Sequence, residues 1–457
     1  MKIKTKKEES SNNLPLLNTD AAGIDIGGSF HFVAVPADRD EKPVRKFDCF
    51  TRDLKALADW LTQCKIKTIA MESTGVYWIP LYEILEARGF QVLLVNSRHV
   101  KNVPGRKSDV LDCQWLQQLH TFGLLRASFR PTQTICELRS LMRQRESLIR
   151  YASSHVQHIQ KSLTQMNLHL TNVVSDVTGV TGMKIIRSIL EGERSPETLA
   201  ENRDRRCKQT KETIAKSLEG NYRNEHLFAL KQAVDLYDFY QAKIVECDKE
   251  IEKIIQSMKK GYAASETQID PNEKAPRKHR NGLSFDARAY LKQLTGVDLT
   301  KINGLDTHSL LRLIGEVGLD MDRWPTAKHF GSWLSLAPGS KISGGKVLSS
   351  RTVPSNNRAA NILRIAASTL HHSTSALGAF LRRQKARLGP PKAITATAYK
   401  IARLFYIMMK HKKEFNDLGQ DYYEEQHRAQ VIHNMKRRAQ KLGFQMMPIN
   451  NIELGAI

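Results

Sequence analysis

The 457-residue sequence lacks the features that would assign it to several common protein classes. It has no apolar run of about 18 residues, so no membrane-spanning helix is predicted, and its polar amino terminus lacks the apolar core of a signal peptide. Its six cysteines include no C-x-x-C pair and no nearby histidine at zinc-ligand spacing, which argues against a zinc site or a disulfide framework. We therefore expect a cytoplasmic protein with no membrane partner.

Acidic residues are missing from one long segment. Between Arg323 and Lys413 the sequence has 17 Lys or Arg and no Asp or Glu, in a chain with a formal net charge of +23. Such a segment repels itself unless anions lie against it. The composition therefore predicts a polyanionic partner, nucleic acid above all.

The first 130 residues alternate between strand-like and helix-like segments. Two apolar strands joined through Gly27 and Gly28 are predicted within residues 23–36, and a third within 44–50. Further along, the pattern predicts a helix at 54–63, a strand at 66–71, a helix at 76–88, a strand at 90–95 and a helix at 109–120. This order predicts an α/β domain over residues 20–130.

Four carboxylates occupy notable positions in this domain. Asp25 lies within the first strand, Glu72 ends the fourth, and Asp109 and Asp112 lie three residues apart on the first turn of a helix that Ser108 can cap. Crowded carboxylates repel one another unless cations neutralise them. Oxygen ligands suit Mg²⁺ or Mn²⁺, and two such ions about 4 Å apart can hold the attacking and leaving oxygens of a phosphoryl transfer. We therefore predict a ribonuclease-H-like domain with a two-metal phosphodiester site.

A coiled coil is predicted over residues 131–260. Apolar residues recur in steps of three and four from Ile135 to Val173, with Arg145 as the single break, so a 3.5-residue period holds for more than five heptads. A second, less regular seam runs from Leu227 to Met258. The two helices could pair as an antiparallel hairpin within one chain or between chains; the length of the first seam favours pairing between protomers.

The carboxyl-terminal half is predicted to be mainly helical. A polar segment with Pro271 and Pro276 predicts a linker over residues 261–290, followed by a domain over 291–415 and a helical tail over 416–457. Within that domain, the turn at Gly304 between two short amphipathic helices resembles a helix-hairpin-helix. Such a glycine turn leaves backbone N–H groups to hold a nucleic-acid phosphate.

Residues 339–346 are predicted to form a flexible loop flanked by cations. A serine there could be an exposed nucleophile, and Lys341 and Lys346 could stabilise the charge of a phosphate. Composition does not choose among the candidates, which are Ser335, Ser340, Ser343, Ser349 and Ser350.

Several longer motifs together resemble one family, the DEDD transposases of bacterial insertion sequences of the IS110 type. The motifs are GIDIG at 23–27, AMESTGVYW at 70–78, NxxHVKNVPGRKSDVLD at 96–112, LAPG at 336–339 and ISGGK at 342–346. The likeness covers nearly the whole chain after residue 20. It assigns no role to residues 174–224 or to the tail after Phe415.

The resemblance implies a role for each candidate residue. Asp25, Glu72, Asp109 and Asp112 would be the acids of a Holliday-junction-resolvase-like domain that binds Mg²⁺ or Mn²⁺. Ser343 would be the nucleophile that forms a 5′-phosphoserine link during strand exchange. The enzyme would act as a homo-oligomer, a dimer or tetramer, in which the acids of one protomer and the serine of another complete each site.

The resemblance also implies nucleic-acid partners. A structured non-coding RNA would pair with both donor and target DNA, and the protein would be associated with the bacterial nucleoid. We assign nucleic-acid contacts to nine residues, namely Arg98, Lys101, Arg106, Lys107, Gly304, Lys341, Lys346, Arg351 and Arg358.

Three alternatives come from other functional classes. Residues 23–30 also look like the first phosphate loop of sugar kinases and actin-like ATPases, but the sequence has neither a second Asp-x-Gly-Gly segment nor an adenosine-binding glycine-rich run. A metal-dependent hydrolytic nuclease of the Holliday-junction type, without a serine intermediate, is the closer enzyme alternative. The non-enzyme alternative is a coiled-coil protein that only binds DNA.

Overall fold

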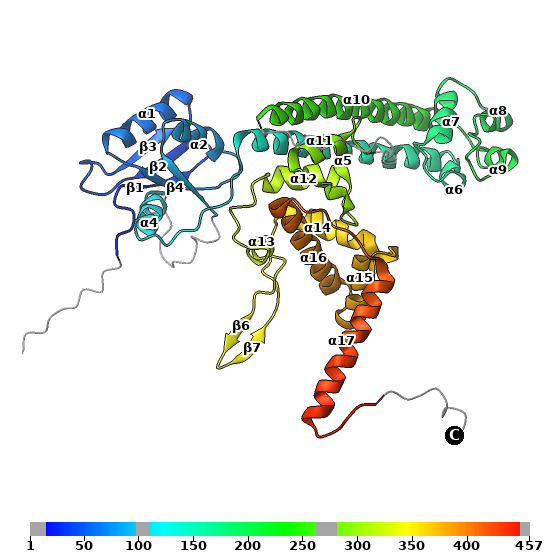
Figure 1. Cartoon of the computed structure of the whole chain (residues 1–457). Helices are drawn as coiled ribbons and strands as arrows, with labels where there is room; N and C mark the ends of the chain where they lie inside the picture. The colour runs from blue at the N-terminus through cyan, green and yellow to red at the C-terminus, as the bar shows by residue number, and fades with distance from the viewer. Residues whose placement is uncertain (1–14, 97–108, 262–280, 448–457) are drawn as a thin grey trace, which may run out of the picture. The chain divides into compact units, whose positions relative to one another are not determined.

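The structure is a computed structural model and describes residues 15–96, 109–261 and 281–447. The chain divides into two compact units, residues 1–130 and 131–457 (Figure 1). Four of the residues assigned to nucleic acid, Arg98, Lys101, Arg106 and Lys107, lie outside the described residues, and so does Ser108, the predicted cap of a helix.

The first unit is built on a five-stranded mixed sheet. Its strands are β1 (Ala21–Ile26), β2 (Phe30–Ala34), β3 (Val44–Asp48), β4 (Thr68–Glu72) and β5 (Gln91–Val95). Their order is β3-β2-β1-β4-β5, in which β2 is antiparallel to both neighbours and β1, β4 and β5 are parallel. Helices make the crossovers that parallel strands require. The predicted α/β character of this unit is confirmed.

Helices cover both faces of this sheet (Figure 1). On one face, α1 (Thr51–Gln63) and α2 (Trp78–Ala87) bury an apolar core against the strands, with members such as Ile24, Met71, Leu57, Leu61, Leu81 and Leu85. On the other face lies α4 (Asp109–Thr121), packed against β1. A Cβ atom on Gly23 would lie 2.3 Å from the carbonyl oxygen of Cys113 in α4, so this close approach requires glycine.

A long helical hairpin begins the second unit. Helices α5 (Gln133–Gln165) and α10 (Asn224–Gly261) run side by side and antiparallel, because residues late in α5 meet residues early in α10 (Figure 1). For example, the rings of Tyr151 and Tyr240 are 5.6 Å apart, and the Cys247 thiol donates to the Leu141 carbonyl at 3.5 Å. The structure therefore adopts the intrachain alternative. The expectation of pairing between protomers rested on an apolar seam that needed a cover, and α10 supplies that cover within the chain.

The first apolar seam does not continue to Val173 as one helix. Helix α5 ends at Gln165, and Asn167 has a left-handed backbone with φ of +58°. The apolar residues beyond it, Leu168 and Leu170, join a second core instead. That core is completed by four short helices: α6 (Leu170–Val173), α7 (Val180–Leu190), α8 (Pro196–Ala200) and α9 (Lys211–Lys216).

Arg145, the single break in the seam, is fully buried and ion-paired. Its Nε donates to Asp248 Oδ1 at 2.5 Å, and its other N–H groups meet Asp248 Oδ2, the carbonyls of Asn281 and Gly282, and His308 Nε2. All five guanidinium donors therefore have acceptors. A buried charge is tolerated only when it is paired and hydrogen-bonded in this way. The network joins α5 and α10 to α12 (Thr307–Val317).

The network makes the stability of the protein depend on pH. Burial, reinforced by the charges of Arg145 and Arg312, lowers the pKa of His308 from 6.5 to about 4. Between these values the unfolded chain binds a proton that the folded chain does not, so the free energy of unfolding should fall as pH drops from 6.5 towards 4, by up to about 3 kcal/mol. Urea unfolding across this range measures the fall. In His308→Gln the same profile should be flatter, and an unchanged profile would contradict the assignment.

The carboxyl-terminal part of the second unit is mainly helical, as predicted. Its helices after α10 are α11 (Ala287–Thr295), the 3-10 helix η1 (Leu299–Lys301), α12, α13 (Ala327–Trp333), α14 (Arg358–Thr369), η2 (Leu370–His372), α15 (Ala376–Leu388), α16 (Pro390–His411) and α17 (Gly419–Lys441). Helix α11 begins inside the predicted linker. The core includes Phe330, Phe405 and Trp324, whose carbonyl accepts the Tyr406 hydroxyl at 2.6 Å.

A β-hairpin projects from these helices (Figure 1). It consists of β6 (Lys341–Ser343) and β7 (Lys346–Ser349). The predicted flexible loop is therefore an ordered ribbon.

None of the helices among the described residues is long and apolar enough to cross a membrane.

Candidate functional site

Two of the four predicted acids lie side by side on the sheet. Ile24 of β1 pairs with Met71 of the parallel strand β4, so Asp25 and Glu72 are the next residues on the two strands. Neighbouring strands are about 4.8 Å apart, and residues at equal register point to the same face. That face is the one covered by α4, because Gly23, two residues before Asp25, faces the backbone of α4.

The other two acids lie at the start of α4. Asp109 and Asp112 occupy its first turn, where the helix dipole favours negative charge. Cys113, the next residue, is buried, and burial raises the pKa of its thiol to about 12, with further contributions from Asp25 and Asp112. The strand acid Asp25 and the helix acid Asp112 therefore both lie near this thiol.

The donor set of the four acids and the arrangement of their side chains point in different directions. Their oxygen-only donor set suits a hard divalent ion such as Mg²⁺. Among the described residues, however, no three His, Cys, Asp or Glu side chains are placed to hold one metal ion. Glu72 accepts a hydrogen bond from the Thr74 hydroxyl at 3.2 Å. The chemistry of the donor set fits a divalent ion, whereas the side chains are not arranged as a closed set of ligands.

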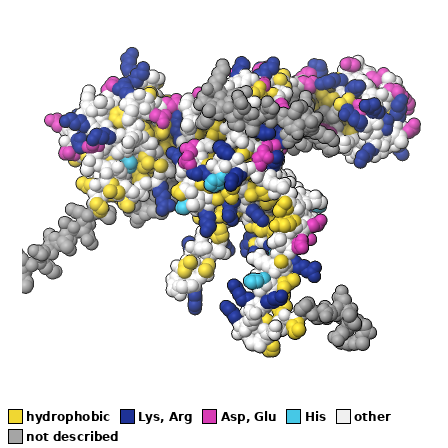
Figure 2. Space-filling view, viewed as in Figure 1, with side chains coloured by type: hydrophobic (Ala, Val, Ile, Leu, Met, Phe, Trp, Pro, Cys, Tyr) yellow, Lys and Arg dark blue, Asp and Glu magenta, His cyan; other side chains and the backbone are white. Residues whose placement is uncertain are grey.

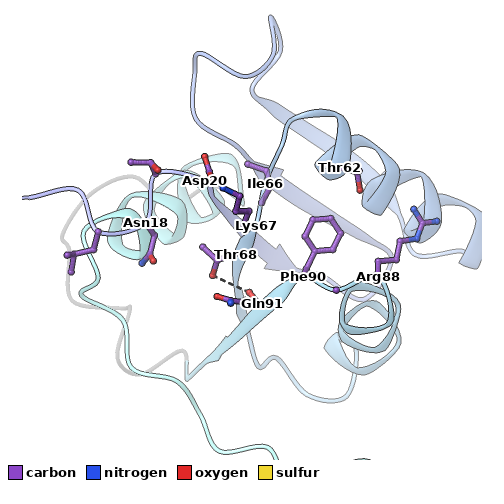
Figure 3. A pocket seen from close by; sticks show the side chains of 12 residues that line it. Asn18, Asp20, Thr62, Ile66, Lys67, Thr68, Arg88, Phe90 and Gln91 are labelled. Carbon is purple, nitrogen blue, oxygen red and sulfur yellow. Dashed lines mark hydrogen bonds and ion pairs between the residues drawn. The ribbon is translucent and has the colours of Figure 1, made fainter.

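A cavity of about 540 Å³ lies at the opposite end of the sheet, where β1, β4 and β5 begin (Figure 3). Thr68, the first residue of β4, donates to the carbonyl of Gln91 at 3.2 Å across this end. Asp20 is paired with Lys67 and Arg39 at 2.7 Å each, and hydrogen bonds from these two cations lower the pKa of its carboxyl. The cavity is thus separate from the acids at the carboxyl ends of the strands.

Ser343 lies at the end of the β-hairpin. It pairs with Lys346 across a two-residue turn in which Gly344 and Gly345 have φ of +54° and +75°. Two positive φ values are typical of the type I′ turn, which glycine adopts without strain. The double glycine therefore builds the ribbon, and the side chains from Lys341 to Leu348 are all exposed.

The two faces of the hairpin differ in chemistry. Paired residues of an antiparallel ribbon share a face, and faces alternate along each strand. Lys341, Ser343 and Lys346 therefore lie on one face, while Ile342 and Val347, which pair with each other, lie on the opposite face. Ser343 is thus a hydroxyl between two ammonium groups.

The remaining candidate serines have other settings. Ser335 follows α13 with a left-handed backbone at φ of +56°. Ser349 accepts a hydrogen bond from the Arg351 backbone N–H at 3.3 Å. Ser340 precedes β6 and Ser350 follows β7, and both are exposed.

Three of the residues assigned to nucleic acid have clear local surroundings. Gly304 has φ of +89°, and a Cβ there would lie 2.7 Å from the Ala366 carbonyl of α14, so packing alone requires glycine at this turn. Arg358 begins α14, and its Nη1 is 3.9 Å from Glu146 Oε2. Arg351 is exposed, and its carbonyl accepts from the Gly339 N–H at 2.9 Å.

The sequence did not point to an arginine-lined cavity of about 200 Å³ in the second unit. Four arginines and two glutamates from α5, α12 and α14 line it: Arg139, Arg143, Arg312, Arg358, Glu146 and Glu316. Arg143 bonds both oxygens of Glu316 at 2.9 Å, which joins α5 to α12. The spacing of Arg139 and Arg143, one helical turn apart, can be read from the sequence. Their partner Glu316 cannot, because it lies more than 170 residues further along the chain.

Comparison with family models places these features in two matched regions. A DEDD transposase model of the IS110 type matches residues 22–168, and a model described as transposase, IS116/IS110/IS902 family, matches residues 298–381. The chain belongs to the IS110-type transposases. It is therefore an enzyme that acts on DNA, and its DEDD type indicates dependence on a divalent metal ion. No curated protein matches the sequence. The first matched region contains all four acids of this transposase, and the second contains Ser343.

Proposed function

We propose that this transposase is an RNA-guided DNA recombinase that uses an acid cluster and a serine nucleophile. The observation that carries the proposal is the position of Ser343, exposed at the end of an ordered hairpin and sharing one face with Lys341 and Lys346. A phosphate next to this hydroxyl would have its charge balanced by the two ammonium groups. A structured non-coding RNA, which pairs with donor and target DNA, and a homo-oligomer are part of the same proposal.

The fold of the first unit supports a ribonuclease-H-like assignment. Its order β3-β2-β1-β4-β5, with only β2 reversed, is the order of that fold. Ligands of such sheets bind beyond the carboxyl ends of the parallel strands, which is where Asp25 and Glu72 lie.

In the proposed reaction each group has a defined task. Asp25, Glu72, Asp109 and Asp112 hold Mg²⁺ or Mn²⁺, which when bound supplies charge neutralisation at the scissile phosphate. Lys341 and Lys346 orient that phosphate. Ser343 Oγ loses its proton to a general base and bonds to phosphorus, while the bond from phosphorus to the 3′-oxygen breaks and that oxygen takes up a proton. The 5′-phosphoserine link conserves the phosphodiester for rejoining.

Removing charge from the acid cluster should strongly reduce cleavage without unfolding the protein. In Asp25→Asn or Glu72→Gln we expect strand cleavage to fall roughly 10²- to 10³-fold. The thermal midpoint should hold or rise, because loss of one carboxylate relieves repulsion. EDTA should have the same effect on the unmodified enzyme. Cleavage of end-labelled DNA and thermal unfolding are the measurements.

The matched control is Asp48→Asn, at the end of edge strand β3, which should cleave normally. Full cleavage in excess EDTA would rule out the proposed metal site.

The salt dependence of DNA affinity should report the hairpin cations. Lys341, Lys346 and Arg351 form no ion pair with any described residue, and each phosphate contact contributes about 0.9 to the slope of log affinity against log salt. Replacing all three with Gln should lower this slope by about 2 to 3. A titration by fluorescence anisotropy from about 50 to 200 mM salt measures it.

The control for this experiment replaces three lysines of α10 that already have acidic partners: Lys231, Lys243 and Lys253. Their replacement should leave the slope nearly unchanged. Equal slopes in the two triple variants would show that the hairpin does not contact phosphates.

A further inference from the structure

The second face of the hairpin has no function in the chemistry proposed above. On this face Ile342 is 64% exposed and Val347 62%; beside them Leu348, which lies at the bulge of β7 outside the regular pairing, is 68% exposed. Isolated exposed aliphatic residues are common on proteins, but three adjacent ones on a two-stranded ribbon form a patch that indicates binding. Figure 2 shows hydrophobic side chains on the hairpin next to Lys and Arg side chains.

We propose that the β6–β7 hairpin is a wedge that enters DNA where the strands separate, with its aliphatic face against unpaired bases. This inference rests on the proposed function, because it places Ser343 on the opposite face, towards the backbone of the strand to be cut. The binding partner is DNA with exposed base surfaces.

The positive charge around the hairpin favours nucleic acid over protein as its binding partner. The hairpin belongs to the segment from Arg323 to Lys413, which contains no acidic residue. Each strand of the hairpin begins with a lysine that is followed directly by an aliphatic residue, Lys341-Ile342 in β6 and Lys346-Val347 in β7, so a partner must be both anionic and apolar within a few ångströms. Unpaired DNA has this combination, since phosphates and apolar base surfaces alternate along it.

The width of the hairpin and the type of its exposed side chains also fit DNA as the binding partner. Two strands about 5 Å apart form a ribbon narrow enough for a DNA groove about 12 Å wide. Ile and Leu are among the side chains that proteins insert between base steps to unstack them. The type I′ turn ends the ribbon with Gly344 and Gly345, where an added Cβ would meet no atom of the described residues within 4 Å, so the tip is thin.

The test uses the full-length protein, purified with any RNA that it retains, and a synthetic DNA fork. The fork has one duplex arm, two unpaired oligothymidine arms and 2-aminopurine at the junction, and a blunt duplex of equal length is the comparison. In Ile342→Thr/Val347→Thr the β-branched shape is kept while the apolar face is lost. We expect affinity for the fork to fall roughly tenfold, affinity for the duplex to stay unchanged, and the 2-aminopurine signal to be lost.

Two control variants distinguish loss of the aliphatic face from loss of the nucleophile and from loss of any other exposed apolar side chain. Ile365→Thr on α14 removes a residue that is 50% exposed and should leave both the fork preference and the signal intact. Ser343→Ala should also keep them. The test of the wedge therefore does not depend on whether Ser343 is the nucleophile. The proposal is overturned if the double variant retains the fork preference, if the unmodified protein shows no preference for the fork, or if Ile365→Thr loses as much as the double variant.

Discussion

Ser343→Ala should eliminate the covalent protein–DNA adduct and lower recombination by more than about 10⁴-fold, with RNA and DNA binding near normal. The substitution removes one exposed hydroxyl from the end of a hairpin, so the fold has no reason to change. The Ser343 hydroxyl is the group proposed to form the phosphoester, whereas Lys341 and Lys346 on the same face remain to attract phosphate. Labelled DNA on a denaturing gel, followed by peptide mapping of the adduct, measures the loss.

Ser340→Ala is the matched control, since it is exposed and three residues away but lies outside the strand. It should form the adduct normally. Attachment of DNA at Ser340, or strand cleavage that persists in Ser343→Ala, would favour the hydrolytic nuclease without a serine intermediate.

The second large effect concerns stability. Arg145→Ala should reduce the free energy of unfolding by about 3 to 5 kcal/mol, because it leaves the Asp248 carboxylate buried without its partner. Arg145 and Asp248 have 0% and 1% of their surface exposed, so water cannot replace the lost ion pair. Asp248→Ala should cost a similar amount. Urea unfolding followed by circular dichroism measures both.

A surface ion pair provides the comparison. Arg187 and Asp238 are paired at 3.0 Å with side chains 53% and 45% exposed, so Arg187→Ala should cost less than about 1 kcal/mol. The double variant Arg145→Met/Asp248→Leu should recover part of the loss, because no charge is then left unpaired. Recovery should be incomplete, since the Asn281 and Gly282 carbonyls still lose their donors. Equal costs for Arg145→Ala and Arg187→Ala would contradict the buried-pair argument.

Periodic patterns in the sequence predicted most elements of the fold. The strand and helix segments of the first unit were found because their apolar residues alternate or recur at helical spacing. The same reasoning placed Asp25 within the first strand and Glu72 at the carboxyl end of the fourth. It could not give their distance from Asp112, which depends on how closely α4 approaches β1.

Features that depend on distant partners were not predicted. Arg145 looked like a defect in an apolar seam because its acid lies 103 residues away in the chain. The hairpin around Ser343 was interpreted as a flexible loop, although two consecutive glycines between short alternating segments are also a signal of a type I′ turn. The helix break at Asn167 was not predicted, because the apolar spacing continues beyond it, although the later apolar residues belong to a different core.

Gly23 has no functional group, yet it fixes the separation between the strand that carries Asp25 and the helix that carries Asp109 and Asp112. Its missing Cβ lets the backbones of β1 and α4 approach more closely than any other residue would allow. The structural constraint at this position is therefore a distance and not a chemical group. A residue that touches neither metal nor DNA can in this way be as intolerant of substitution as a catalytic one.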